Sequence, residues 1–290
     1  MKNLIGAFSL LILITAASCK KHHSSSSAST AASGSYVSSV SSYTAGTGSA
    51  GSRVVDSFAY DTTTHQVTTF IQYKYDTTSN TPTLDSTIYH FSFSGGSNLP
   101  ATYTQTVLTL TGSTTSLHQL SYDGQNRITK DTSVSGDGFV TYYSYPTNGV
   151  VIDILFDGTP GPSNNEIDSF TVSGSNLSGL KAYYPNAELT ADSLEGTLTF
   201  SYSGSANPFY HSGFSNTIGP LFVTLTTNGF GSEEDFISAS ETSSVTIYAY
   251  GLPSGITVPF TIATDSKGRV STVSSSNVLY GTGIATYNYY

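Results

Sequence analysis

Cysteine, tryptophan and charged residues are scarce in this chain. Its 290 residues include one cysteine, no tryptophan and only 10% charged side chains. A single cysteine cannot form a disulfide within the chain, so it needs another explanation. The formal net charge is −9, and Lys and Arg form no extended basic patch, which argues against a nucleic-acid-binding surface.

The common catalytic and phosphate-binding signatures are missing as well. The sequence contains no G-x-S-x-G, no G-x-x-x-x-G-K and no H-E-x-x-H motif. We therefore expect no cofactor, no metal centre and no catalytic residues. On this basis we predict that the protein is not an enzyme.

The N-terminus carries an apolar run that is too short to span a bilayer comfortably. Residues 4–17 follow a short basic start and fit the core of a secretory signal. Small residues at positions 16–18 close this run, and Cys19 follows. A plain signal peptide or a short membrane anchor is compatible with the same pattern.

The A-A-S-C stretch at residues 16–19 resembles the lipobox of bacterial lipoproteins, in which the cysteine is acylated and becomes the new N-terminus. This resemblance implies that residues 1–18 are a lipoprotein signal peptide and that Cys19 carries the lipid. Several acyl chains together hold a protein stably on a membrane. We therefore expect a protein of the cell envelope that is lipid-anchored to the outer membrane through Cys19.

Residues 19–51 are rich in Ser, Ala, Gly and Thr and carry little apolar bulk. Such a composition does not offset the entropy of ordering, so it predicts a disordered tether that follows the lipidated cysteine. His22 and His23 are potential metal ligands, but two adjacent exposed histidines are usually solvated.

Alternation of apolar and hydroxyl residues dominates residues 52–290, which we expect to form a single all-β domain. Residues 197–203 alternate without a fault, with Leu198, Phe200 and Tyr202 on one face and Ser or Thr on the other. The same pattern recurs at residues 86–93, 244–250 and 285–290. A period of two predicts antiparallel strands with one packed face and one wet face.

Acidic or hydroxyl residues end many of these strands. They are Asp61, Asp76, Ser94, Asp123, Ser173, Ser203 and Asp265, and each is followed three or four residues later by Asn, Gly or His. An Asp or Ser side chain can accept a hydrogen bond from a backbone N–H two residues on, and Gly and Asn adopt left-handed conformations readily. Calcium binding is the alternative, but none of these corners has the ligand spacing of an EF-hand loop. We interpret them as turns.

Residues 207–243 break the alternation and predict an irregular insertion with one short helix near residues 216–226. Long loops inside compact domains often carry function, which makes this insertion a candidate binding site. Its acidic triplet Glu233-Glu234-Asp235 offers carboxylates for a hydrolase together with His211. Acidic triplets are, however, most often solvated surface.

Tyrosines gather in two runs, at residues 142–145 and 287–290. They suit stacking on a sugar ring or a partner, but cross-strand packing is the simpler interpretation. His90 and His118 lie in strand-like runs without a common spacing, so we expect structural or solvated histidines there.

Y-D-G-Q-N-R-I at residues 122–128 and T-D-S-K-G-R-V at residues 264–270 resemble the unit of YD-repeat (rearrangement-hotspot) proteins, with Arg127 and Arg269 in matching places. The layout of residues 54–290 is also similar to a group of Bacteroidota-type secreted lipoproteins of unassigned function. The shared features are a Ser-rich tether, YD-like hairpins, an N-P-F-Y stretch and a Tyr-rich final strand. The resemblance implies a meandering, curved antiparallel sheet of YD-like hairpins on the cell envelope.

Together these features predict a non-enzymatic, lipid-anchored envelope protein. Its partner is expected to be a glycan, a peptide or another protein, bound through the sheet face or the 207–243 insertion. A purely structural spacer or assembly component is the second possibility, and a carboxylate-dependent hydrolase is the third. A strip of solvent-facing Tyr would favour binding, whereas a deep pocket that gathers the carboxylates would favour the hydrolase.

Overall fold

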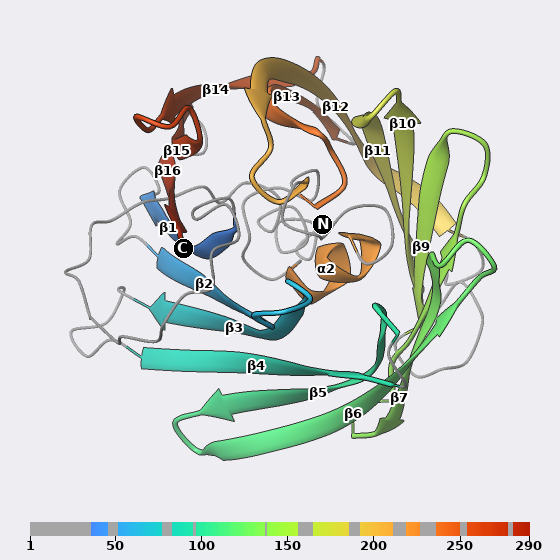
Figure 1. Ribbon diagram of the computed structural model, residues 1–290. Coiled ribbons are helices and arrows are strands. Elements are labelled where there is room, and N and C mark those ends of the chain that lie inside the picture. Colours follow the sequence, from blue (N-terminus) through green and yellow to red (C-terminus); the bar gives the residue numbers. More distant parts are fainter. Residues whose placement is uncertain are drawn as a thin grey trace.

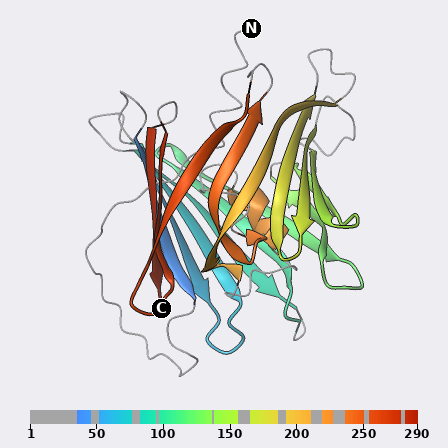
Figure 2. The same cartoon turned by 90° about the horizontal axis from the view of Figure 1, so that it is seen from above.

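A computed structural model describes residues 36–45, 52–76, 83–94, 97–136, 138–155, 165–185, 192–210, 219–226, 236–249, 254–277 and 281–290. They form a closed antiparallel barrel of sixteen strands, seen down its axis in Figure 1 and from the side in Figure 2. The strands are β1 (Val37–Ala45), β2 (Ser52–Tyr60), β3 (Val67–Asp76), β4 (Thr83–Phe93), β5 (Pro100–Thr109), β6 (Gly112–Tyr122), β7 (Ile128–Ser135), β8 (Val140–Ser144), β9 (Gly149–Leu155), β10 (Asn165–Ser173), β11 (Asn176–Pro185), β12 (Asp192–Ala206), β13 (Ser240–Ala249), β14 (Ile256–Thr264), β15 (Val270–Asn277) and β16 (Gly281–Tyr289).

The expectation of a meandering, curved sheet of YD-like hairpins is wrong, because the sheet closes on itself into a barrel. Each strand pairs with the next along the chain, and β1 also pairs with β16, with Val40 opposite Tyr287 and Tyr43 opposite Ile284. An open sheet would leave unpaired N–H and C=O groups along two edge strands, and closure removes both edges. The closing pair joins the first and the last strand of the chain, so no local sequence pattern indicates it.

Strand β1 lies inside the range expected to be a tether. Val37 and Val40 are both buried, yet they are three residues apart because the register shifts between Val37 and Ser39. This irregularity hides the period of two that marks the other strands. The barrel therefore begins at residue 37, well before the boundary at residue 52 that composition suggests.

The predicted strands at residues 86–93 and 197–203 are confirmed as parts of β4 and β12, and those at 244–250 and 285–290 are confirmed over residues 244–249 of β13 and 285–289 of β16. Leu198 and Tyr89 are buried, and Phe200 packs against the same core. On β14, Val258 is buried while its neighbours Thr257 and Pro259 are exposed. The prediction of one packed face and one wet face is correct, and the packed face is the inside of the barrel.

Helix α2 (Gly219–Thr226) lies inside the ring of strands, in the part of the insertion where a short helix is expected (Figure 1). Its Phe222 is fully buried and packs on the inner wall, with ring centroids 5.8 Å from Phe70 and 5.6 Å from Phe91. Much of the described insertion is similarly buried, so residues within 207–243 fill the lumen. We call these described residues, 207–210, 219–226 and 236–239, the plug.

The interpretation of the acidic corners as turns is confirmed at both ends of the chain. Asp61 accepts a hydrogen bond from the N–H of Thr63, two residues on, at 2.9 Å, and His65 has a φ of 58°. Asp265 accepts from the N–H of Lys267 at 2.8 Å, and Gly268 has a φ of 77°. These positive φ angles are the left-handed conformations that the sequence predicted.

Candidate functional site

The hairpin between β6 and β7 holds an arginine over a tyrosine ring. Asp123 Oδ1 accepts the N–H groups of Gln125 (2.8 Å) and Arg127 (2.9 Å), and Asn126 completes the turn with a φ of 64°. The Arg127 guanidinium donates from Nε to Asp123 Oδ2 at 2.8 Å and lies over Tyr145, 4.2 Å from the ring centroid. The hydrogen bond from the Arg127 N–H is the main cause that lowers the pKa of Asp123 below its usual range.

The hairpin between β14 and β15 repeats this arrangement. Arg269 donates from Nε to Asp265 Oδ2 at 2.8 Å and lies 4.1 Å from the ring centroid of Tyr289. Tyr289 donates to the carbonyl of Val270 at 2.6 Å, and Tyr145 makes the matching bond in the first corner at 2.7 Å. The two YD-like units are therefore equivalent in structure as well as in sequence.

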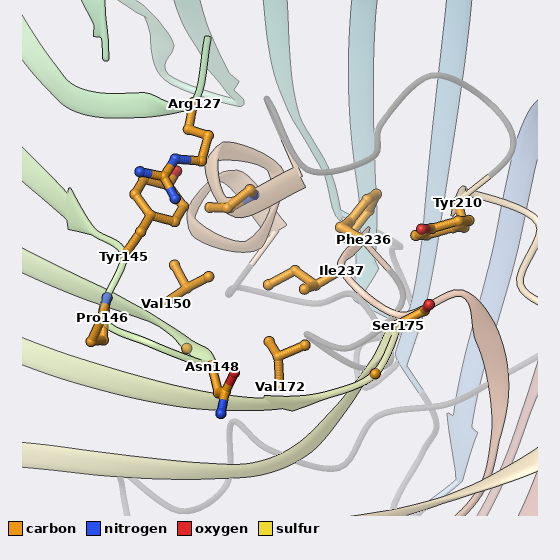
Figure 3. A pocket seen from close by; sticks show the side chains of 13 residues that line it. Arg127, Tyr145, Pro146, Asn148, Val150, Val172, Ser175, Tyr210, Phe236 and Ile237 are labelled. Atoms are coloured by element: carbon orange, nitrogen blue, oxygen red, sulfur yellow. The ribbon is translucent and has the colours of Figure 1, made fainter. Parts of the chain in front are cut away.

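A cavity of about 390 Å³ lies beside the first corner, between the barrel wall and the plug (Figure 3). Its lining includes Arg127, Tyr145, Val172, Tyr210, Phe236 and Ile237. We call it the rim pocket, because its wall comes from the ends of hairpins at one rim of the barrel. Small-ligand sites in proteins typically enclose roughly 300–1,000 Å³, so the rim pocket has the right size for one.

Polar and apolar groups line the rim pocket in similar measure. Val172 and Ile237 point into the same space in Figure 3. Asn148, with a φ of 63°, accepts the N–H of Val172 through its carbonyl at 2.8 Å and fixes this part of the rim. Arg127 uses Nε and Nη2 to bond Asp123, so further guanidinium N–H donors are available to a ligand. The described lining contains no acid–base pair, and the arrangement is suited to binding.

No pattern in the sequence indicates this pocket. In the sequence, Arg127 stands out only as the arginine of a YD-like unit. Nothing in the sequence places it near residues 236 and 237. The contact depends on the plug folding back into the lumen, which brings together residues about a hundred positions apart.

A second polar cluster is buried on the inner wall of β5, β6 and β7. Tyr103 donates to Asp131 Oδ2 at 2.5 Å, and His118 Nδ1 lies 2.9 Å from Asp131 Oδ1. His118 Nε2 lies 3.1 Å from Ser116 Oγ. This geometry places the proton on Nδ1, so that Nε2 accepts from the serine hydroxyl. Burial and the nearby Asp131 carboxylate hold the pKa of Tyr103 well above its usual range.

The order Ser116–His118–Asp131 is that of a nucleophilic triad, but its surroundings favour a structural role. Ser116 and His118 are only 7% and 4% exposed, and neither lines the rim pocket. Catalysis would require a substrate carbonyl and oxyanion donors beside the serine. The cluster instead satisfies polar groups that the barrel buries, and it couples three neighbouring strands.

Replacing Asp131 with Ala is expected to destabilise the barrel by about 2–4 kcal/mol, because it leaves buried donors of Tyr103 and His118 without their acceptor. Tyr103 can still donate to His118 Nδ1, 2.9 Å away, if the imidazole changes tautomer, which limits the loss. Ser116→Ala should cost about 1 kcal/mol. Urea denaturation of both variants measures the two effects, and equal effects would contradict the central place of Asp131 in the cluster.

Asp56 on β2 is a further buried acid. It is fully buried, and Oδ1 accepts a hydrogen bond from Gln72 Nε2 at 3.1 Å. Burial raises the pKa of Asp56 to about 8, although the Gln72 hydrogen bond and the charge of Lys74 act in the opposite direction. Its Oδ2 has no hydrogen-bond partner in the described part of the chain. Asp56 is therefore mostly neutral at pH 7.

Several residues singled out in the sequence lie outside the described residues, namely Cys19, His22, His23, His211, Glu233, Glu234 and Asp235. Lipidation and the carboxylate-dependent hydrolase thus stay predictions. Within the described ranges, no group of three or more His, Cys, Asp or Glu could hold a metal ion. The same ranges contain no helix with the length and apolar character to cross a membrane.

The two tyrosine runs pack across strands, as predicted, at their buried members. Tyr143 and Tyr287 are 3% and 6% exposed and belong to the core. Tyr142 faces outward, 41% exposed, with the Lys130 ammonium 5.2 Å from its ring centroid. His90 is exposed and contacts a threonine hydroxyl, whereas His118 is buried in the cluster described above.

No protein family and no curated protein matches this chain in sequence. Among solved structures, a porin-like protein from Bacteroides uniformis ATCC 8492 is similar, with a TM-score of 0.53 and 12% identity over 88% of this chain and 98% of that chain. A porin-like protein from Bacteroides vulgatus ATCC 8482 has a TM-score of 0.44, 12% identity and the same coverage, 88% and 98%. At this identity the first similarity concerns the fold alone, and that fold is the barrel. The YD-repeat and lipoprotein resemblances are not among these findings and stay predictions.

Proposed function

We propose that the protein is a non-enzymatic, lipid-anchored barrel of the cell envelope that stands in water and binds a small ligand in its rim pocket. The polarity of the wall carries this proposal. A membrane barrel presents an apolar band roughly 25 Å tall to the lipid and a polar interior. Here the order is reversed on β14: Thr257 and Thr261 face outward and are exposed, while Val258 points inward and is buried.

The filled lumen supports a binding role over a conducting one. Phe209, Phe222 and Phe236 of the plug are fully buried, and their rings contact one another and the inner wall. Aromatic side chains packed in this way form a hydrophobic core. A water-filled channel would need polar groups in their place.

The proposed anchor places the rim pocket on the side of the barrel that the tether enters. In an antiparallel meander the starts of odd strands and the ends of even strands share one rim. Val37 begins β1 at that rim, where its carbonyl accepts the Tyr60 hydroxyl at 3.0 Å, and the hairpin with Arg127 lies there too. If Cys19 is acylated and the expected tether is disordered, residues 20–36 would separate the lipid from this rim by roughly 20–25 Å.

Cys19→Ser is expected to move the protein from the envelope fraction to the aqueous fraction of the cells, because acyl chains at Cys19 are its proposed hold on the membrane. Fractionation and mass spectrometry of the mature N-terminus check this. Retention in the envelope without acylation would remove the lipid anchor from the proposal. The barrel and its pocket do not depend on that outcome.

Arg127→Leu is expected to weaken ligand binding at least about tenfold, whereas Arg269→Leu leaves it unchanged. The two arginines make the same ion pair and the same cation–π contact, so each substitution should lower the stability of the fold by a similar amount. Only Arg127 lines the rim pocket. The measurement is ligand-observed NMR with a library of aromatic fragments, monosaccharides and short peptides.

The arginine pair separates binding from a purely structural role. Hits that respond to Arg127→Leu alone support the rim pocket as the site. A library without hits, or hits that respond equally to both variants, would instead favour the spacer or assembly component.

A further inference from the structure

The two halves of the barrel share sequence motifs on corresponding strands. The tripeptide D-S-F occurs at residues 56–58 on β2 and again at residues 168–170 on β10, eight strands later. F-S-F-S at residues 91–94 and F-S-Y-S at residues 200–203 mark β4 and β12 in the same way. The YD-like corners between β6 and β7 and between β14 and β15 have the same spacing in strand number. β1–β8 and β9–β16 therefore match at these three places, and the plug is an insertion into the second half.

By this correspondence, Val172 of the rim pocket has an equivalent residue on β2. Phe58 and Phe170 are equivalent and both fully buried. Two residues further along the same inward face come Tyr60 on β2 and Val172 on β10. Val172 lines the rim pocket, so Tyr60 marks the equivalent place in the other half of the barrel.

Aromatic side chains of the protein itself occupy that equivalent place. The ring of Tyr60 lies 5.3 Å from Tyr36 and 5.9 Å from Tyr290, and Tyr36 stacks on His65 at 5.1 Å. Tyr290 follows the arginine-bearing ring of Tyr289, as Pro146 follows Tyr145 in the first half. Val172 of the rim pocket thus takes the place of Tyr60 at the second corner, and Pro146 takes the place of Tyr290.

We propose that the rim pocket binds a small molecule with a planar aromatic ring and a polar or anionic substituent. The proposal rests on the proposed function and narrows the ligand class. At the Arg269 corner, the arginine and tyrosine lie beside the rings of Tyr60 and Tyr290. At the Arg127 corner, the equivalent arginine and tyrosine lie beside a cavity of about 390 Å³. A free aromatic ligand restores beside the Arg127 corner the packing that Tyr60 and Tyr290 provide beside the Arg269 corner.

The lining matches such a ligand at both its face and its edge. Tyr210 and Phe236 offer aromatic contacts, which favour stacked or edge-to-face rings. Val172 and Ile237 supply apolar walls (Figure 3). Arg127 is the charged residue among the described lining, and its remaining N–H donors suit a carboxylate or hydroxyl on the ring.

The test uses three probes against the chain from residue 20 onward, which contains every strand and the plug. They are 4-hydroxyphenylacetate, cyclohexylacetate, which has the same charge but no planar ring, and glucose. By ligand-observed NMR titration, 4-hydroxyphenylacetate is expected to bind with a Kd on the order of 1–10 mM, as ligand-efficiency limits suggest for its size. The other two probes should bind at least about tenfold more weakly.

Two reciprocal substitutions locate the site. Val172→Tyr copies the second corner into the first, so it should fill the rim pocket and abolish binding of 4-hydroxyphenylacetate while the barrel stays folded. Tyr60→Val opens the equivalent place in the other half and should raise the stoichiometry from one site to two. Thermal unfolding of both variants shows that the barrel is intact.

Loss of binding in Val172→Tyr together with the preference for 4-hydroxyphenylacetate supports the proposal. Binding of glucose or cyclohexylacetate at equal strength, if Val172→Tyr removes it, overturns the aromatic class and leaves the ligand-binding function standing. Binding that survives Val172→Tyr, or no binding of 4-hydroxyphenylacetate to the unmodified chain, overturns the inference. Should Tyr60→Val not fold, Val172→Tyr alone decides between these outcomes.

Discussion

A chain shortened to residues 46–290 is expected to lose the folded barrel altogether. The truncation removes β1, which pairs with β2 on one side and β16 on the other. Two ladders of backbone hydrogen bonds disappear, together with the buried side chains of Val37 and Val40. At about 1 kcal/mol per hydrogen bond the loss is on the order of 10 kcal/mol, comparable to the whole stability of a typical domain.

The matched control begins at residue 30 and keeps β1 complete. Far-UV circular dichroism and size-exclusion chromatography compare the two chains. The control should melt in one cooperative transition as a monomer, whereas the chain from residue 46 should aggregate through the exposed edges of β2 and β16. A cooperative melt of the shorter chain at an unchanged temperature would mean that closure by β1 does not hold the barrel together.

Asp56→Asn is expected to stabilise the protein at pH 8 by roughly 5 kcal/mol and to change little at pH 3. Burial raises the pKa of Asp56 to about 8 in the fold, from 3.8 in the unfolded chain. Between these values the folded state keeps a proton that the unfolded state has released. The stability that Asp56 contributes is therefore full below about pH 4, falls as the pH rises towards 8 and is flat above that.

Urea denaturation at pH 3, 5, 7 and 8 measures this dependence, and the difference between the parent and Asp56→Asn isolates the one carboxyl. Asp61→Asn serves as the control. Hydrogen bonds from Thr64 and Thr63 lower the pKa of the exposed Asp61, so its contribution changes only at acidic pH. A parallel pH profile for Asp56→Asn and the parent would show that Asp56 is not a neutral buried acid.

Local physical rules in the sequence predicted the strands and the turns. β12 follows from the strict alternation of Leu198, Phe200 and Tyr202, and the Asp123 corner follows from an acid placed three residues before Asn126. Both depend on contacts between residues close in sequence. The wet outer face was also predictable, because Ser and Thr alternate with apolar residues.

Closure and the pocket depend on contacts between distant residues. The β1–β16 pair joins the first and the last strand of the chain. The register shift near Val37 also hides the alternation of apolar residues in β1. The rim pocket forms only when the plug returns Phe236 and Ile237 to the hairpin of Arg127. One long-range signal was present in the sequence: the repeated D-S-F tripeptide, which marks Asp56 and Asp168 as equivalent and divides the barrel into halves.

Analytical ultracentrifugation of the chain from residue 20 onward, in buffer without detergent, tests most directly whether the barrel stands in water around a filled lumen. The protein is expected to sediment as a single monomeric species that binds no added detergent, because hydroxyl side chains cover much of the wall and aromatic side chains fill the inside. A chain that sediments as aggregates unless detergent micelles surround it would show that the wall belongs in lipid, and the proposed function would fall with it.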